Sequence, residues 1–208
     1  MIRRLALAAV LVMLPACSRP GPRHAPPALT GPPRVAVMPF RTARAPGAET
    51  EPVPADAGLA AARMLGAHLA ALGIAVVDAD RVLGTWSLSD THVYDASLAA
   101  HVGERVGANV AAFGVLSRYH ERQGSAWAVE SPAAVAYEAA LVHVPDGTLI
   151  AVDRFEYAQQ ALSQNLLELP RFVEGGGRWL TREELLDQSL AHTAERLGRA
   201  LGVAPGRR

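Results

Sequence analysis

The apolar positions after residue 33 alternate between short strand-like runs and longer stretches with helical spacing. Residues 34–40, 74–77 and 109–116 are short and rich in apolar side chains, which is typical of buried strands. Residues 56–72 and 95–106 place their apolar side chains three or four positions apart, as one face of a helix requires. Apolar strands that alternate with helices favour parallel pairing in a buried sheet.

The predicted helices have recognisable ends. Asp56 is a predicted N-cap, because a short polar side chain can satisfy the first N–H groups of a helix. Gly73 and Gly107 are predicted C-terminal stops, because glycine readily adopts the left-handed turn that ends a helix. Asp80 is predicted to cap a further helical turn towards Trp86. The predicted inward face of the first helix consists of Leu59, Ala62, Leu65, Leu69 and Leu72.

The pattern changes after residue 132. Residues 133–144 and 148–157 are strand-like and flank Pro145-Asp146-Gly147, a turn sequence that predicts an antiparallel β-hairpin. Thr181-Arg182-Glu183-Glu184 has the spacing of a capping box and opens a last helix that ends at Gly202. The predicted fold class is therefore α/β. It has a mixed sheet of about five strands, three of them parallel and two from the hairpin, with helices packed on its faces. The predicted apolar stripe of the last helix is Leu186, Leu190, Ala194, Leu197 and Leu201.

Charge and cysteine content exclude several classes of function. The chain has 208 residues, and its 20 basic residues, all of them Arg, balance 20 acidic ones. A formal net charge of zero gives no general attraction to nucleic acid. Cys17 is the one cysteine, so the chain can form neither an intramolecular disulfide nor a thiolate metal cluster.

The N-terminal segment has the organisation of an export signal. Arg3 and Arg4 precede an uncharged apolar run over residues 5–14, which is about half the length that a membrane-spanning helix needs. Leu14-Pro15-Ala16-Cys17 resembles the lipobox of bacterial lipoproteins. That resemblance implies cleavage before Cys17 and acylation of its thiol, which would become the mature N-terminus.

The segment after Cys17 reads as a spacer. Six prolines fall between residues 18 and 33, and prolines favour an extended chain that cannot pack a core. In the lipoproteins that the leader resembles, Asp after the cysteine marks retention in the inner membrane, so Ser18 favours the periplasmic face of the outer membrane. The predicted organisation is a signal peptide over 1–16, an acylated tether over 17–33, one domain over 34–203 and a disordered tail over 204–208.

Four short motifs resemble a group of envelope proteins. They are Met38-Pro39-Phe40 after the first strand, Val76-Val77-Asp78 with Asp80-Arg81-Val82, Val106-Gly107-Ala108-Asn109-Val110, and Phe113-Gly114-Val115-Leu116. In this order they are similar to periplasmic lipoproteins related to the amino-terminal domain of TolB, to CsgG and to LpoB. The resemblance implies a mixed α/β sheet with helices on its faces, and it does not imply a shared activity. Residues 117–132 look too short and irregular for the membrane hairpins of a CsgG-type pore, so no pore activity is expected.

Motifs that carry catalytic or metal chemistry are missing from the sequence. The seven histidines show no spacing that would place two metal ligands on one helix face, although His92, His101 and Asp95 remain candidates for a spatial cluster. Asp78 with Asp80 is either a carboxylate pair or, as we expect, a strand end and a helix cap. Gly175-Gly176-Gly177 before Arg178 is expected to be a flexible turn rather than an anion-binding loop.

One apolar segment without clear periodicity precedes the last helix. Residues 162–179 either fold back over the sheet as a clamp, the favoured interpretation, or offer apolar anchors to a partner. The expected function is a membrane-anchored, non-enzymatic adaptor or assembly factor that binds another envelope protein, without cofactor, metal or nucleic acid. A small-ligand binding module and an envelope hydrolase remain alternatives. The candidate interaction residues are Leu166, Leu167, Phe172 and Trp179.

Overall fold

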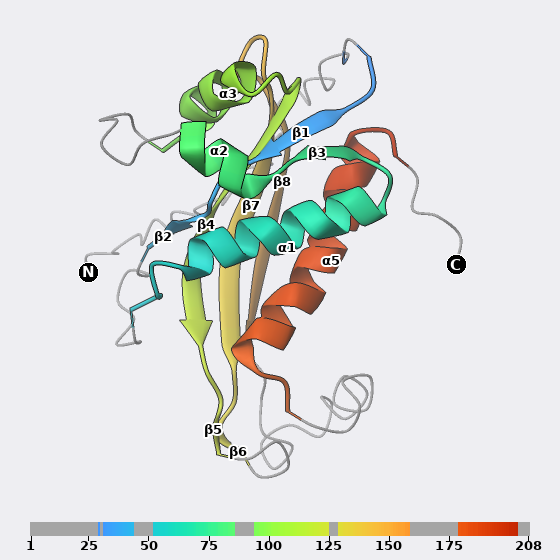
Figure 1. Cartoon of the computed structure of the whole chain (residues 1–208). Helices are drawn as coiled ribbons and strands as arrows, with labels where there is room; N and C mark the ends of the chain where they lie inside the picture. The colour runs from blue at the N-terminus through green and yellow to red at the C-terminus, as the bar shows by residue number, and fades with distance from the viewer. Residues whose placement is uncertain are drawn as a thin grey trace, which may run out of the picture.

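A six-stranded mixed sheet with helices on both faces forms the centre of the computed structural model (Figure 1). The structure describes residue 29 and residues 31–43, 52–85, 94–124, 129–158 and 179–203. The strand order is β3-β1-β4-β7-β8, with the short β2 paired to β4. These strands are β1 (Arg34–Val37), β2 (Arg41–Thr42), β3 (Ala75–Val77), β4 (Val110–His120), β7 (Ala134–His143) and β8 (Leu149–Ala158).

Both halves of the sheet pair as the sequence predicts. β1 lies between β3 and β4 and is parallel to both, with Val35 opposite Val76 on one side and Val110 on the other. β4, β7 and β8 pair antiparallel in chain order. The predicted hairpin is confirmed, and Gly147 in its turn has a φ of +66°, a backbone angle that glycine adopts without strain.

Residues 117–124 and 129–132, the described part of this segment, are more regular than the sequence suggests. β4 runs four residues past Leu116 to His120. β5 (Gln123–Gly124) and β6 (Val129–Ser131) then form a two-stranded ribbon in the connection between β4 and β7. A register shift between Leu116 and Arg118 breaks the simple alternation of the strand, so Tyr119 is buried although the pattern in sequence is irregular. The prediction of an irregular segment here was wrong.

Two helices cover one face of the sheet. α1 (Ala57–Ala71) and α5 (Arg182–Ala200) contact each other and lie across this face (Figure 1). The predicted inward side chains Leu65 and Leu69 of α1 are fully buried, and so are Leu186 and Leu190 of α5. Tyr137 at the centre of β7 packs into the same core and stacks on Phe155 of β8 with ring centroids 5.4 Å apart.

The other face is covered at one end only by described helices. α2 (Ala79–Thr85) and α3 (Ala96–Arg105) pack over β1 and the first part of β4, where they bury Met38, Val82 and Val102. Beyond α3, side chains of opposite charge on neighbouring strands pair with one another on this face. Arg154 is opposite Glu138, and Glu156 is paired with Arg118.

The helix ends confirm the predicted capping box and correct two predicted side-chain caps. Thr181 and Glu184 form the predicted capping box, with Thr181 Oγ1 accepting from Glu184 N at 3.2 Å and Glu184 Oε2 accepting from Thr181 N at 3.0 Å. Asp56 stands at the predicted N-cap position of α1, but its backbone is already helical (φ −77°, ψ −19°) and its side chain makes no cap hydrogen bond. The predicted cap at Asp80 is wrong, because the carboxylate of Asp78 accepts from Asp80 N at 2.8 Å.

Within the described ranges, the helices are each too short or too polar to span the apolar layer of a bilayer.

Candidate interaction surface

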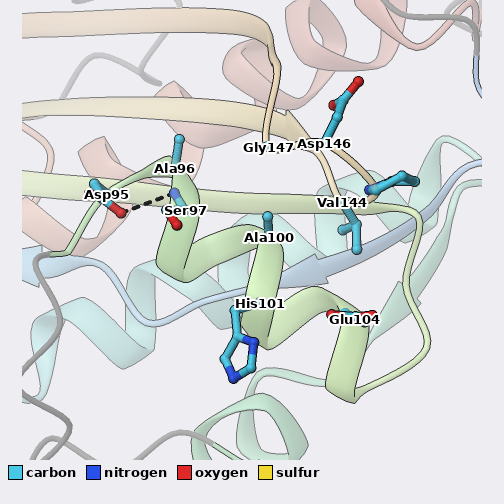
Figure 2. Close-up of a pocket in the computed structure, with 10 residues that line it drawn as sticks. Asp95, Ala96, Ser97, Ala100, His101, Glu104, Val144, Asp146 and Gly147 are labelled. Carbon is cyan, nitrogen blue, oxygen red and sulfur yellow. Dashed lines mark hydrogen bonds between the residues drawn. The ribbon is translucent and has the colours of Figure 1, made fainter.

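An open groove lies between α3 and the turn that joins β7 to β8 (Figure 2). Its volume is about 590 Å³ and it is wide open to solvent. Ala100 of α3 and Val144 at the start of the turn line the groove, and carboxylates lie around them. We call this feature the α3 groove; it is lined by Asp95, Ala96, Ser97, Ala100, His101, Glu104, Val144, Pro145, Asp146 and Gly147.

Local sequence determines both walls of the α3 groove. Asp95 has an extended backbone, and its Oδ1 accepts hydrogen bonds from Ser97 N and Leu98 N at 3.0 Å each, so it starts α3 at this point. The four-residue spacing of Ala96, Ala100 and Glu104 then aligns these side chains along one side of the helix.

The opposite wall depends on Asp146. Its Oδ1 accepts from Thr148 N at 2.9 Å and lies 2.9 Å from His143 Nδ1, so the carboxylate fastens both sides of the turn. The backbone hydrogen bond from Thr148 is the main cause that lowers the pKa of Asp146, and the contacts with the Thr148 and His143 side chains lower it further. Asp146 is therefore anionic at neutral pH.

The rim of the α3 groove is acidic. Asp95, Glu104 and Asp146 are exposed carboxylates, and the ten lining residues include neither Lys nor Arg. Among the described contacts, Glu104 and the exposed His101 make no side-chain hydrogen bond or ion pair. Glu104 thus presents an uncompensated negative charge to any molecule in the groove.

Two large apolar side chains are exposed beside the α3 groove. Leu149 is 51% exposed and Val152 is 48% exposed, and both belong to β8. The register places Leu149 opposite Val142, which packs in the core under α3, and Val152 opposite Ala140. Directly paired residues share a face of the sheet, so Leu149 and Val152 lie on the α3 side of the molecule. We call them the β8 apolar pair.

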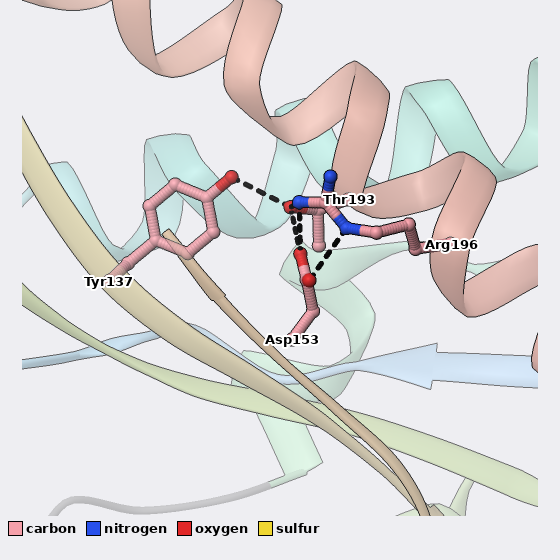
Figure 3. Close-up of polar contacts among 4 residues, drawn as sticks. All are labelled: Tyr137, Asp153, Thr193 and Arg196. Atoms are coloured by element: carbon pink, nitrogen blue, oxygen red, sulfur yellow. Dashed lines mark hydrogen bonds and ion pairs between the residues drawn. The ribbon is translucent and has the colours of Figure 1, made fainter. Parts of the chain in front are cut away.

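A polar network links the hairpin to α5 on the opposite face (Figure 3). Arg196 donates to both carboxylate oxygens of Asp153, from Nε at 2.6 Å and from Nη2 at 2.7 Å. Thr193 Oγ1 lies 2.5 Å from Asp153 Oδ2 and 2.8 Å from the Tyr137 hydroxyl. Burial raises the pKa of Tyr137, and the Asp153 bond raises the pKa of Arg196. Each polar group has a partner inside the network, so it serves as a structural link between β7, β8 and α5.

The structure separates the residues that sequence reasoning grouped as candidate sites. Asp78 caps α2, whereas Asp80 forms an ion pair with Arg63 at 2.5 Å, so both carboxylates have structural partners. Asp95 and His101 both line the α3 groove but make no described contact with each other (Figure 2), while His92 lies outside the described residues. In the part of the chain that the structure describes, no three His, Cys, Asp or Glu side chains are grouped as metal ligands.

The sequence-predicted interaction segment is described only at its end. Trp179 is buried at 7% exposure. Cys17, Leu166, Leu167, Phe172 and Gly175-Gly176-Gly177 lie outside the described residues. The α3 groove and the β8 apolar pair were not predicted as a site, since only the hairpin register brings the turn and β8 beside α3.

Comparison with known proteins gives distant matches of fold only. No family model matches the chain, and no curated protein matches its sequence. The PelC dodecamer from Paraburkholderia phytofirmans aligns with a TM-score of 0.48 at 16% identity, over 89% of this chain and 96% of that one. Lipoprotein GNA1162 from Neisseria meningitidis aligns with a TM-score of 0.44 at 16% identity, over 70% of this chain and 96% of that one. The LpoB C-terminal domain from Escherichia coli aligns with a TM-score of 0.40 at 19% identity, over 61% of this chain and 83% of that one. Similarities this distant do not determine family or function.

Proposed function

We propose that the chain is a lipid-anchored envelope protein whose domain acts as a non-enzymatic adaptor for another envelope protein. The leader over residues 1–16 supports export, and Cys17 is the residue that would carry the lipid. Two or more acyl chains hold a protein stably on a membrane, whereas one chain gives marginal binding. Residues 17–33 would space the domain over 34–203 from the bilayer, and Ser18 favours the outer membrane.

The observation that carries the adaptor role is the β8 apolar pair beside the α3 groove. Leu149 and Val152 are half-exposed on β8, on either side of a register shift in its pairing with β7 and next to an open groove. Burial of such exposed aliphatic side chains against a partner removes apolar surface from water, which stabilises a protein interface. A small-ligand site usually buries most of its ligand's surface, and an open groove suits an extended protein segment better.

The contacts of the acidic side chains also support a non-enzymatic role. Asp95 caps α3, Asp146 holds the hairpin turn, and Asp153 joins β8 to α5. A general acid or base must reach its substrate's proton in a productive position. These three carboxylates instead hold backbone or side-chain donors of their own chain.

Mass spectrometry of the native N-terminal peptide tests the anchor. We expect a chain that starts at Cys17 and carries diacylglycerol and acyl groups, and we expect Cys17→Ala to move the protein out of the membrane fraction. An unmodified Cys17 thiol, or a Cys17→Ala variant that stays with membranes, would contradict the anchor.

Crosslinked membranes test the adaptor role. Purification of the full chain after crosslinking should repeatedly recover one envelope protein in stoichiometric yield. Repeated recovery of no partner, together with a rise in Tm when an envelope metabolite is added, would instead support the small-ligand alternative. A ligand at 100 times its Kd adds about 2.7 kcal/mol of stability.

A further inference from the structure

We infer that the α3 groove and the β8 apolar pair together form a docking site for a basic, apolar segment of a partner envelope protein. This inference rests on the proposed adaptor function and specifies its surface and the chemistry of its partner. The segment would place an apolar side chain against Leu149 and Val152, and Lys or Arg side chains against the carboxylates of the groove.

The apolar part of the site is continuous across the sheet. Phe113, Ala140 and Val152 lie opposite one another on β4, β7 and β8, and so share one face. Phe113 is partly buried and packs edge-on against Tyr94 at 5.9 Å between ring centroids, which closes the row at the β4 end. At the β8 end, Val152 is left 48% exposed, so a partner side chain can complete the row.

The acidic part of the site favours a partner segment with positively charged side chains. Asp95, Glu104 and Asp146 rim the groove. Both Asp95 hydrogen bonds described above use Oδ1, so its Oδ2 remains available as an acceptor, and the exposed Glu104 carboxylate makes no described hydrogen bond. A cationic side chain would therefore gain charge-assisted hydrogen bonds in the groove, whereas an anionic one would be repelled.

The same charges argue against a second copy of this chain as the occupant. A two-fold contact through the α3 groove would bring each copy's groove against the other's, because such an interface uses the same patch twice. Glu104 and Asp146 of one copy would then face the same acidic rim. The charge pattern thus favours a different protein with the opposite charge.

Site-specific photocrosslinking tests the inference in the native envelope. The full chain carries p-benzoylphenylalanine at position 149 or 152, and at Gln188 as the control, an exposed position of α5 on the opposite face. We expect crosslinks from positions 149 and 152 to one envelope protein, within a peptide that contains Lys or Arg next to an apolar residue. Gln188 should give no crosslink to that protein.

Charge reversal with the recovered partner completes the test. Glu104→Arg should weaken binding about tenfold, and binding should also fall as salt is raised. Reversal of the contacting basic residue in the partner should restore it. Glu183→Arg, at an exposed position of α5, should leave binding unchanged.

Three outcomes would overturn the inference. Crosslinks from position 152 to a second copy, or to the chain's own residues 18–28, would show a different occupant. A partner that crosslinks at Gln188 and not at 149 or 152 would leave the adaptor function in place and reject this surface. The absence of any crosslinked protein from all three positions would reject both.

Discussion

Asp153 of β8 holds Arg196 of α5 in a two-pronged ion pair, with N–O distances of 2.6 and 2.7 Å. The Asp153 side chain is only 12% exposed, and its remaining contact is with the buried Thr193 hydroxyl. The hairpin and the last helix are thus joined by polar bonds as well as by apolar packing.

Asp153→Ala should lower the free energy of unfolding by about 2 kcal/mol, because hydrogen bonds to charged groups contribute about 1.5–3 kcal/mol and the Thr193 hydroxyl stays buried. Arg154→Ala, the next residue on β8, is the matched control. Its side chain is 76% exposed, so the change should stay within about 0.5 kcal/mol. Urea unfolding of the two variants measures both free energies. Equal losses of stability in the two variants would show that the network does not stabilise the fold.

Gly58→Ala should be strongly destabilising. A Cβ at Gly58 would lie 2.0 Å from the carbonyl oxygen of Phe40, and Gly58 O also accepts from Phe40 N at 2.9 Å. The backbone has to move apart, at a cost of about 1–3 kcal/mol or more. Gly84→Ala makes the same change in α2, where nothing lies within 4 Å, and should be neutral or slightly stabilising. Thermal unfolding measures the Tm of both variants. Equal Tm values would contradict the close approach of Gly58 to the Phe40 backbone.

Asp95→Ala should cost about 1 kcal/mol of stability, because it removes the acceptor for two N–H groups at the start of α3. Asp56→Ala removes the same side chain before α1, where no side-chain cap bond exists, and should cost far less. Circular dichroism melts of both variants measure the difference. A larger loss for Asp56→Ala would contradict the cap assignment.

The stability contribution of Asp146 should depend on acid pH. The pKa of its carboxyl is lower in the folded protein than in the unfolded chain, chiefly through the Thr148 backbone hydrogen bond. The unfolded chain therefore binds the proton first, so the contribution is complete above the unfolded pKa of about 4 and is lost as pH falls through the folded value. Asp146→Asn should flatten this part of the stability profile, on the acid side of the unfolded pKa. An unchanged acid limb in the variant would count against the assignment.

Local signals carried most of the fold prediction. The capping box at Thr181, the turn before Gly147 and the helical spacing of Leu65 and Leu69 act over a few residues, and all three features are confirmed. Asp56 stands at the predicted start of α1 without making a cap hydrogen bond, because its backbone is helical, which residue type alone does not set. The predicted cap at Asp80 was wrong because the neighbouring Asp78 accepts the hydrogen bond at the start of α2.

Long-range relationships were out of reach of the sequence pattern. Asp153 and Arg196 are 43 positions apart and meet only because β8 and α5 pack on the same core. The α3 groove likewise needs the register that places the hairpin turn beside Ala100. Asp95 and His101 were noticed as a pair, but their neighbours across the groove come from a hairpin that begins 29 positions after the end of α3.

The place of β1 has a mechanical consequence. The chain enters the domain at this interior strand, whose neighbours β3 and β4 run parallel to it on both sides. The Asn109 side chain also holds the start of β1 in place, since it donates to Pro32 O at 3.0 Å and accepts from Arg34 N at 2.8 Å. A pull on the N-terminal end along the strand would load both rows of hydrogen bonds in shear, so they would have to break together and not one after another. Single-molecule pulling from this end should therefore need more force than pulling from the edge strand β8.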